Sequence, residues 1–375
     1  MTVLFLRSNP VNPDSRVEKE IAVLLGLGYK VSVFAWDRNA SYPVKAEPLN
    51  DALNDVTAYR VGIPANYGSG IRNIKPLLAF QKAIRRFLKT HTFDVIHACD
   101  FDTAYTAYHI IDRKKTKFIY DVFDYYADAF RIPSILRPAV VRADRKILNG
   151  ADAVFLCTEK RKEQIGTARP KKLVIIHNAP PETERSEHTV RSGNSVRLAY
   201  FGILAEGRMI RELCDIVAND PRLELHIGGF GYLEDEVRRF SDGCDRIVFY
   251  GRTPYDQVLR AESDSDLLTA IYDPAVRNHY YAAPNKFYEA LMLGKPLIMV
   301  HGTGMSEVVE EHDLGEVIPY SYEGLKNGLD RLIDRRSEWE RMSGEMTELY
   351  RSSYSWSEMA KRIESVYRNL ELEHS

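Results

Sequence analysis

A lysine and a glutamate stand three residues apart in the otherwise apolar segment YYAAPNKFYEALMLGKPLI, residues 280–298. Pro284 predicts the start of a helix that ends near Gly294, so Lys286 and Glu289 would share one helix face. A surface pair of this kind is usually a solvated ion pair worth well under about 1 kcal/mol. Lysine in a first turn, however, opposes the helix dipole, and an anionic ligand would justify it. The pair is therefore either a surface ion pair or two separate contacts, to a phosphate and to ribose hydroxyls.

Another segment with the chemistry of a phosphate site lies earlier in the second half. The apolar run SVRLAYFG ends at Gly202, and Arg208 follows six residues later at a predicted helix start. A glycine at the carboxyl end of a strand lets a ligand approach the backbone, and an arginine offers paired donors to a diphosphate. Arginines are also common at helix starts on protein surfaces, so this segment alone does not decide between the two interpretations.

A glycine-rich turn, Gly228-Gly229-Phe230-Gly231, follows the predicted strand LELHI. A dinucleotide fingerprint would need a third glycine and an acid after the next strand, but RIVFYG ends in Tyr250 and Gly251 and is followed by Arg252. A tight strand-to-helix turn and a ligand loop explain the pattern equally well.

In the first half, the segment KFIYDVFDYYAD gathers acids and aromatic residues after a predicted strand: Asp121, Asp124, Tyr125, Tyr126 and Asp128. Capping acids at a strand end would give the same pattern as contacts to a substrate. The carboxyl end of a strand in a parallel sheet faces the usual ligand crevice, which favours a functional role for Asp121 and Asp124.

The elements that position these residues alternate between apolar strands and amphipathic helices along most of the chain. This alternation predicts an α/β fold with two Rossmann-like doubly wound sheets facing a cleft. A polar, turn-rich stretch near residues 180–195 predicts the boundary between them. We expect a first domain over 1–185, a second over 186–350, and a C-terminal helix over 351–375 that packs back on the first.

Composition narrows the class of protein. The 375 residues suit two average domains, and the four scattered cysteines form no C-x-x-C pair, which favours a reducing cytoplasm over a zinc or disulfide framework. We expect neither a signal peptide nor a membrane span. The net charge of −2 combines a net +10 over residues 1–180 with a net −12 over the rest. The basic half predicts an anionic partner, with chance drift as the alternative.

Two basic, apolar segments, residues 69–91 and 131–148, have the composition of helices that lie on an anionic membrane surface. Ordinary amphipathic helices that bury their apolar face have the same composition. The first interpretation predicts a cytoplasmic protein at the inner face of the membrane.

The second half resembles the nucleotide-sugar domain of retaining glycosyltransferases of the GT-B fold, close to family 4. Arg208, six residues after Gly202, stands at a position that is usually a diphosphate-binding lysine. The arginine that usually follows the glycine is Ile203 here. Glu289 and the turn Gly294-Lys295-Pro296 match the end of the family's two-glutamate helix, and Tyr281 replaces the first glutamate. The sequence is similar to a branch that reads P-x-K-x-x-E, in which Lys286 supplies charge near the donor phosphates.

The first half resembles the same family more loosely. Asp14 and Arg16 lie where the family has a glycine pair, in the first strand-to-helix loop. FDVIHACD, which ends at Asp100, resembles a D-V-I-H-A-H-D segment. Phe123 replaces a family histidine, and Asp124 stands at the position of the acid that follows it.

The resemblance implies a cytoplasmic transferase that moves a sugar from a UDP- or GDP-sugar to a glycan or lipid-linked acceptor in polysaccharide or glycoconjugate synthesis. It implies retention of configuration, no metal or other cofactor, and no nucleic-acid partner. The catalytic residues would be Asp124, Arg208 and Lys286. The donor contacts would be Gly202, Arg208, Gly229, Phe230, Gly231, Arg252, Tyr281, Asn285, Lys286 and Glu289. The acceptor contacts would be Asp14, Arg16, Asp100, Asp121, Asp124 and Tyr125.

Two alternatives remain. A nucleotide-sugar epimerase shares the fold and transfers nothing to an acceptor. A catalytically silent binding subunit would explain why Ile203, Tyr281 and Phe123 each replace a residue with a function in the family.

Overall fold

The computed structural model describes four stretches of the chain, residues 1–66, 73–129, 132–182 and 195–373. Contacts divide the chain into two compact units, Met1–His177 together with Met359–Ser375, and Asn178–Glu358. The boundary expected near residue 185 lies outside the described residues, and the contacts assign residues 178–182 to the second unit.

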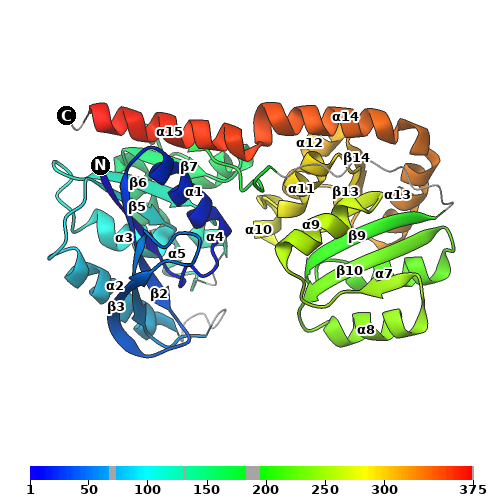
Figure 1. Cartoon of the computed structure of the whole chain (residues 1–375), viewed down its shortest axis with the longest axis horizontal. Coiled ribbons are helices and arrows are strands. Elements are labelled where there is room, and N and C mark those ends of the chain that lie inside the picture. The colour runs from blue at the N-terminus through cyan, green and yellow to red at the C-terminus, as the bar shows by residue number, and fades with distance from the viewer. Residues whose placement is uncertain (67–72, 130–131, 183–194, 374–375) are drawn as a thin grey trace. The chain divides into compact units, whose positions relative to one another are not determined.

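The first unit is built on a sheet of eight strands among the described residues, in the order β3-β4-β2-β1-β5-β6-β7-β8 (Figure 1). All neighbours are parallel except β3, which pairs antiparallel with β4 at one edge. The strands are β1 (Thr2–Arg7), β2 (Lys30–Asp37), β3 (Tyr42–Pro48), β4 (Thr57–Gly62), β5 (Val95–Cys99), β6 (Lys117–Val122), β7 (Ala153–Leu156) and β8 (Leu173–Ile175).

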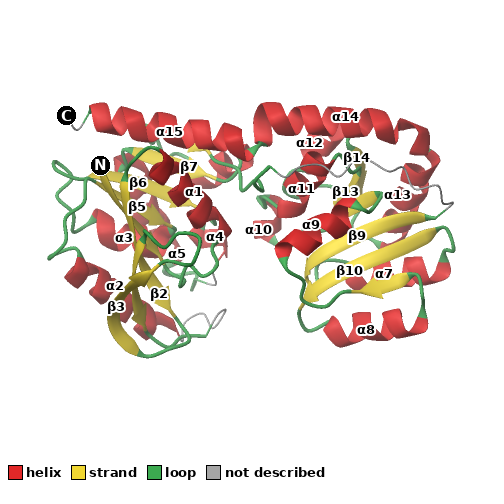
Figure 2. Cartoon of the chain, viewed as in Figure 1, coloured by secondary structure: helices red, strands yellow, loops and turns green. Residues whose placement is uncertain are grey.

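Helices cover both faces of this sheet (Figure 2). Its helices are α1 (Ser15–Gly26), α2 (Ile74–Phe87), α3 (Phe101–Tyr108), α4 (Tyr126–Ala129), α5 (Arg137–Gly150), α6 (Lys162–Ile165) and the last helix α15 (Trp356–Leu372). Helix α3 packs between α2 and α5, which bury Phe80, Ile84 and Ile147 against one face of the sheet. On the other face, the Tyr367 hydroxyl of α15 forms a hydrogen bond of 2.8 Å with Nδ1 of His97 on β5, and the His97 ring stacks on Phe5.

One carboxyl group lies inside the core between the sheet and α5. Asp144 is 1% exposed, and its carboxylate accepts a hydrogen bond of 2.9 Å from the Tyr120 hydroxyl of β6. Burial raises the pKa of Asp144 to about 7, and the bond from Tyr120 only partly opposes this effect. The folded state therefore binds a proton at Asp144 more tightly than the unfolded chain does.

This shift predicts a pH-dependent stability difference for Asp144→Asn. The pKa of this carboxyl group is about 4 in the unfolded chain and about 7 in the folded protein. The folded protein therefore loses stability as the pH increases from about 4 to about 7. Asparagine keeps an acceptor for Tyr120 but does not ionise, so the variant should gain roughly 2 to 4 kcal/mol relative to the parent between pH 4 and pH 8. Urea unfolding of both proteins across this range measures the difference. A difference that does not change with pH would contradict the prediction.

The second unit is built on a sheet of six strands among the described residues, in the order β11-β10-β9-β12-β13-β14, with all neighbours parallel. The strands are β9 (Val196–Ile203), β10 (Leu223–Phe230), β11 (Ile247–Phe249), β12 (Leu267–Ala270), β13 (Leu297–Val300) and β14 (Gly315–Ile318). The helices are α7 (Ile210–Asn219), α8 (Glu234–Gly243), α9 (Tyr255–Ser263), α10 (Arg277–Tyr280), α11 (Asn285–Leu293), α12 (Ser306–Glu311), α13 (Tyr322–Asp334) and α14 (Trp339–Leu349).

Two apolar clusters cover the two faces of this sheet. Alternate residues of β9, such as Leu198 and Tyr200, pack with α7, α8 and α13, while Ala199 and Phe201 pack with α9, α11 and α14. The predicted helix of the lysine–glutamate segment is confirmed as α11, which ends at Gly294 with a left-handed φ of 65°. Two doubly wound α/β units confirm the predicted fold class.

The strand order of each unit reverses direction at one point. In the first unit the chain runs outward from β1 to β2 and then crosses to β5, and in the second it runs from β9 to β11 and then crosses to β12. Ligands of doubly wound sheets bind at the carboxyl ends of the strands that flank such a reversal. These positions follow β1, β5 and the neighbouring β6 in the first unit, and β9 and β12 in the second. In the part of the chain that the structure describes, no helix is long and apolar enough to cross a membrane.

Candidate functional site

Lys286 of α11 reaches the carboxyl end of β9 in the second unit. A Cβ atom placed on Gly202 would lie 2.7 Å from the Lys286 Nζ atom, so the glycine makes room for the ammonium group. The ammonium also lies 4.8 Å from the centre of the Tyr200 ring. Within the described residues it forms no ion pair with a carboxylate.

The charge of this lysine is stable at neutral pH. Burial alone would lower the pKa of Lys286, but the neighbouring tyrosines and the carboxyl groups of Glu289 and Glu262 raise it above its usual value. The site therefore presents a half-buried positive charge beside a bare stretch of backbone. An anion could approach both.

Arg208 supplies a second cation at the same strand end. Its guanidinium lies 3.7 Å from the centre of the Tyr272 ring, and Nη1 lies 3.3 Å from Nε2 of His279. Burial raises the pKa of the Tyr200 hydroxyl, and the charges of both Lys286 and Arg208 oppose this shift, so both cations act on the same group. No carboxylate pairs with Arg208 in the described part of the chain. The structure thus brings together three residues predicted from the sequence, Arg208, Lys286 and Gly202. Tyr272 and His279, which follow β12, also belong to this site and were not predicted.

Glu289 lies one turn along α11 from Lys286 and is only 4% exposed. Its carboxylate accepts a hydrogen bond of 2.9 Å from the hydroxyl of Tyr255, at the start of α9. Glu262, also on α9, is buried beside it, and one of its oxygens has no hydrogen-bond partner among the described residues. Burial and the charge of Glu289 raise the pKa of Glu262 well above its usual value, and the positive charge of Lys286 only partly opposes this shift. Sequence reasoning missed Tyr255 and Glu262.

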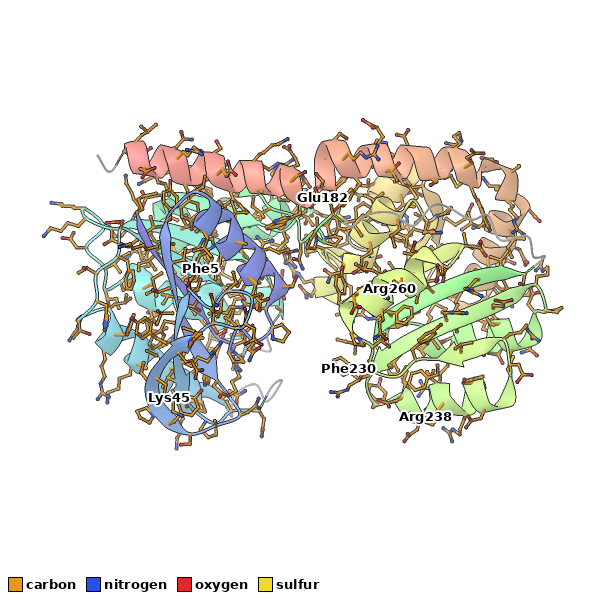
Figure 3. The ribbon with its side chains drawn as sticks, in the orientation of Figure 1. Phe5, Lys45, Glu182, Phe230, Arg238 and Arg260 are labelled. Carbon is orange, nitrogen blue, oxygen red and sulfur yellow. The ribbon has the colours of Figure 1, made fainter. Side chains whose placement is uncertain are left out.

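The glycine-rich turn has a packing explanation. A Cβ atom on Gly229 would lie 1.7 Å from the carbonyl oxygen of Gly202, and one on Gly231 would lie 2.2 Å from that of Leu204. These glycines let β9 and β10 approach each other closely at their carboxyl ends, which supports the tight-turn interpretation. Phe230 is 48% exposed there (Figure 3), and the guanidinium of Arg252 lies 4.6 Å above its ring. The pair forms an exposed, positively charged aromatic surface beside Gly229.

Tyr281 and Asn285 flank Pro284 between α10 and α11. The Tyr281 ring packs edge-on against Tyr280 at 4.8 Å, and the Asn285 side chain accepts a hydrogen bond of 3.1 Å from Asn178. Tyr281 thus lies just before α11, the helix that carries Lys286, and it puts a phenol where the family has its first glutamate.

In the first unit, Arg7 at the end of β1 joins two of the predicted acids. It contacts Asp14, the N-cap of α1, at 2.8 Å and Asp100, after β5, at 2.5 Å. Asp100 also accepts hydrogen bonds from the backbone N–H groups of Phe123 and Asp124. Burial raises the pKa of Asp100 to about 7 although Arg7 opposes the shift. The loops after β1, β5 and β6 therefore meet at one cluster of polar groups.

Arg16 and Asp121 lie beneath this cluster, and their burial argues against the acceptor contacts predicted for both. They are 3% and 0% exposed, and Arg16 contacts Asp121 at 2.8 Å and the carbonyl oxygen of Ile176 at 2.6 Å. Together with Arg7, Arg16 also encloses the ring of Phe123, whose centre lies 4.8 Å from the Arg16 guanidinium. Their hydrogen-bonding groups are used inside the fold.

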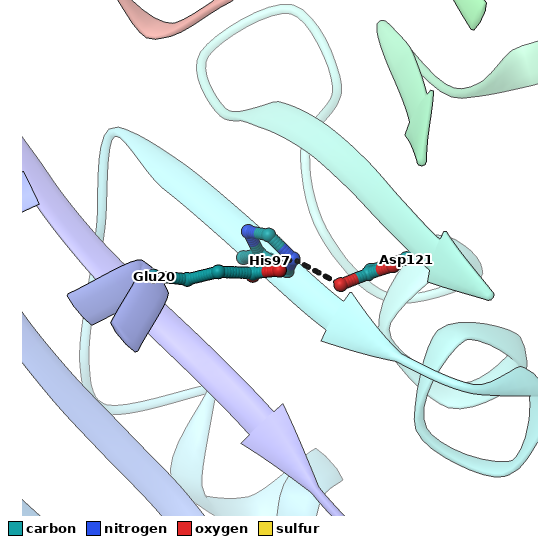
Figure 4. A group of neighbouring side chains, drawn as sticks. All are labelled: Glu20, His97 and Asp121. Atoms are coloured by element: carbon teal, nitrogen blue, oxygen red, sulfur yellow. Dashed lines mark ion pairs between the residues drawn. The ribbon is translucent and has the colours of Figure 1, made fainter. Parts of the chain in front are cut away.

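Glu20, His97 and Asp121 form a buried group with the composition of a metal site (Figure 4). Arg16 already contacts Glu20 at 3.1 Å and Asp121 at 2.8 Å, so it takes the place of a cation between the two carboxyls. Burial and Asp121 raise the pKa of Glu20, and burial lowers the pKa of His97. A neutral Glu20 and a neutral His97 beside an Arg16–Asp121 pair balance the charge without a further ion.

Asp124 and Tyr125, which follow β6, differ in their exposure to solvent. The Asp124 side chain is 48% exposed and pairs with Arg161 at 2.9 Å, so it remains accessible to a substrate. Tyr125 is buried in the core cluster of the first unit, which argues against the predicted contact with an acceptor. Asp14, Asp100 and Asp124 are the predicted acceptor-side residues that lie at the edge of the sheet.

Comparison with known protein families agrees with this geometry. Residues 15–179 match the Glycosyl transferase 4-like domain, and residues 201–335 match the family Glycosyl transferases group 1. Together the two matches cover most of the chain. The chain belongs to the family 4-like glycosyltransferases of the GT-B fold.

One curated relative is the alpha-D-kanosaminyltransferase of Streptomyces kanamyceticus, which is 21% identical over 256 residues. The match covers 63% of this chain and 65% of the relative, which is slightly less than two thirds of its length.

Solved structures share the whole fold. A sucrose-phosphate synthase from Thermosynechococcus elongatus superposes with a TM-score of 0.76 at 15% identity and covers 100% of both chains. A putative UDP-N-acetylglucosamine 2-epimerase from Listeria monocytogenes superposes with a TM-score of 0.64 at 13% identity, over 100% of this chain and 97% of that one. At these identities the likeness shows the fold alone.

Proposed function

We propose that the protein transfers a sugar from a nucleoside diphosphate sugar to a hydroxyl group of an acceptor, and that the second unit binds the donor. The observation that carries the proposal is the pair of cations at the Gly202 end of β9. Arg208 and Lys286 flank a bare strand end at the reversal of strand order, and neither forms an ion pair with a described carboxylate. Two such cations match the charge of a diphosphate.

In this proposal the donor lies across the carboxyl ends of β9 to β11. Arg208 and Lys286 hold the diphosphate, Glu289 accepts hydrogen bonds from the ribose, and the exposed pair of Phe230 and Arg252 lies near the base. The base is that of a UDP- or GDP-sugar. Gly202 has no side chain, which leaves room for the Lys286 ammonium at the end of β9, where the diphosphate would bind.

The reaction we propose retains the configuration at the sugar carbon. The bond from that carbon to the diphosphate oxygen breaks, a bond to the acceptor oxygen forms on the same face, and the acceptor proton passes to an oxygen of the leaving diphosphate. The two cations stabilise the negative charge that develops on the leaving group. They can supply this stabilisation themselves, so the proposal requires no metal ion.

The acceptor is proposed to bind at the polar edge of the first unit, near Asp124 and the cluster of Arg7, Asp14 and Asp100. We propose a glycan or lipid-linked acceptor and a cytoplasmic protein that contacts the inner face of the membrane. The support is a set of exposed apolar side chains beside basic ones. Ile74 and Leu78 of α2 stay exposed although the same helix buries Phe80, and Ile135 is 86% exposed just before the basic helix α5.

A thermal-shift panel tests the donor proposal. One nucleoside diphosphate should stabilise the protein by about 2.7 kcal/mol at 100 times its Kd, and the corresponding nucleoside should stabilise it much less. Transfer from the matching labelled sugar donor, assayed with glycolipid in anionic and in neutral vesicles, then tests the acceptor. No stabilisation by any nucleoside diphosphate would overturn the donor site, and equal transfer in both kinds of vesicle would overturn the membrane contact.

An epimerase is the second candidate, because the putative UDP-N-acetylglucosamine 2-epimerase structure from Listeria monocytogenes shares the whole fold. Incubation with labelled donor and no acceptor separates the two activities. An isomerised nucleotide sugar would overturn the transferase proposal. Tight donor binding without turnover would favour a silent subunit, which the replacements at Ile203, Phe123 and Tyr281 would explain.

A further inference from the structure

His279 stands between the loop after β12 and the phosphate-site arginine. It belongs to the short helix α10, and its two ring nitrogens have different neighbours. Nδ1 lies 2.8 Å from the backbone oxygen of Asp273, and Nε2 lies 3.3 Å from Nη1 of Arg208.

These two neighbours define the protonation of the ring. A carbonyl oxygen only accepts, so Nδ1 carries the hydrogen and donates to Asp273. A guanidinium only donates, so Nε2 carries the lone pair and accepts from Arg208. Burial and the Arg208 charge lower the pKa of His279, which keeps this neutral form present at neutral pH.

The backbone around the pair holds the arrangement in place. The N–H group of Asp273 donates to the carbonyl oxygen of Gly207, next to Arg208, at 2.9 Å. The N–H group of Gly304, after β13, donates to the carbonyl oxygen of His279 at 3.0 Å. The Tyr272 ring covers one face of the guanidinium, and the imidazole meets its edge. Backbone hydrogen bonds therefore connect the loops after β9 and β13 to the segment from Asp273 to His279.

A neutral acceptor has a specific advantage at this place. A carboxylate would orient the guanidinium equally well but would also cancel its charge, as the surface partners of Arg211 and Arg222 do. A neutral imidazole accepts from one N–H of the Arg208 guanidinium and so orients it. The full positive charge and the other N–H donors of the guanidinium stay available to a ligand. Preorganised donors bind a diphosphate without the cost of ordering the side chain.

We propose that His279 is a positioning residue of the donor site, which holds the Arg208 guanidinium in the orientation that binds the diphosphate. The inference rests on the proposed function. It assigns to His279 no contact with the sugar or the acceptor, and it makes the effect of His279 depend on Arg208.

Two substitutions separate the two bonds of the imidazole. His279→Asn keeps a donor near the Nδ1 position for Asp273 but has no atom that reaches Arg208. His279→Gln places a carbonyl oxygen near the Nε2 position and can accept from Arg208. We expect His279→Asn to weaken binding of the nucleoside diphosphate identified in the thermal-shift panel by about tenfold. His279→Gln should restore it to within about threefold, and neither should change binding of the nucleoside without phosphates.

Titration calorimetry of both variants, in the parent and in an Arg208→Ala background, completes the test. His279→Asn should have no further effect once Arg208 is replaced, since its effect acts through that side chain. Equal losses for Asn and Gln, or additive losses with Arg208→Ala, would overturn the inference and leave the donor site standing. A parent protein that binds no nucleoside diphosphate would overturn the proposed function and the inference with it.

Discussion

Replacement of Lys286 with alanine is expected to lower kcat/KM for the sugar donor by roughly 10²- to 10³-fold, with little change in stability. The ammonium lies beside the end of β9 without a carboxylate partner among the described residues, so its removal breaks no ion pair. It does remove one of the two charges proposed to stabilise the leaving diphosphate. Donor turnover measured at saturating acceptor, together with the melting temperature, tests both parts of this expectation.

Ligand analogues distinguish Lys286 from its neighbour on α11. Lys286→Ala should reduce the gain in affinity that the phosphates give to a nucleoside. Glu289→Ala should instead remove the difference between a nucleoside diphosphate and its analogue without ribose hydroxyls. Lys326→Ala provides a matched control, because Lys326 pairs with Asp330 on an exposed helix face. Unchanged donor kinetics in Lys286→Ala would refute the role of this lysine, whatever Glu289→Ala does.

The fold could be predicted from the sequence because its signals are local. Buried parallel strands need continuous apolar runs, and the helices between them need an apolar stripe, so the alternation of β9 to β14 with helices is visible within short windows. The limits of α11 are also local features. Pro284 favours a helix start at Asn285, and Gly294 ends the helix because it adopts a left-handed conformation. Such features depend on neighbours in the sequence.

The partners of the site residues could not be predicted because they come from distant parts of the chain. His279 meets Arg208 across 71 residues, and Tyr255 meets Glu289 across 34. A histidine in the segment VRNHYY has no local signal that distinguishes it from a surface residue. Strand order decides such contacts, since only the reversal between β9 and β12 brings the two loops together.

The burial of three predicted acceptor-side residues could not be foreseen for a related reason. Arg16 and Asp121 lie near the carboxyl edge of the sheet in the sequence, but sequence position could not show that both side chains lie beneath it. Arg16 finds its carboxylate 105 residues away, on the buried face of β6. Tyr125 follows the exposed Asp124 directly and nevertheless turns into the core. Depth depends on packing between elements, which a short motif does not encode.

Replacement of Arg16 with methionine is expected to destabilise the first unit by about 3 to 5 kcal/mol. Arg16 is the cation in a buried group with Asp121 and Glu20, and it also donates to the carbonyl oxygen of Ile176. Its removal leaves the Asp121 carboxylate buried without a cation, and that uncompensated charge accounts for most of the cost. Urea unfolding at pH 7 measures the loss, and Arg238→Met, at an exposed pair with Glu234, should change stability by less than about 1 kcal/mol.

Neutralising the carboxyl partners should recover most of this stability. Arg16 lowers the pKa of Asp121 against the effect of burial, so without Arg16 that pKa rises and Asp121 can take up a proton in the folded state. A protein in which folding raises the pKa of a carboxyl group loses stability as the pH increases. The loss of unfolding free energy in Arg16→Met should therefore be smaller at pH 5 than at pH 8. Adding Asp121→Asn should make the deficit small and nearly independent of pH. A deficit that persists unchanged in the double variant would mean that packing around Phe123, and not the buried charge, is what Arg16 contributes.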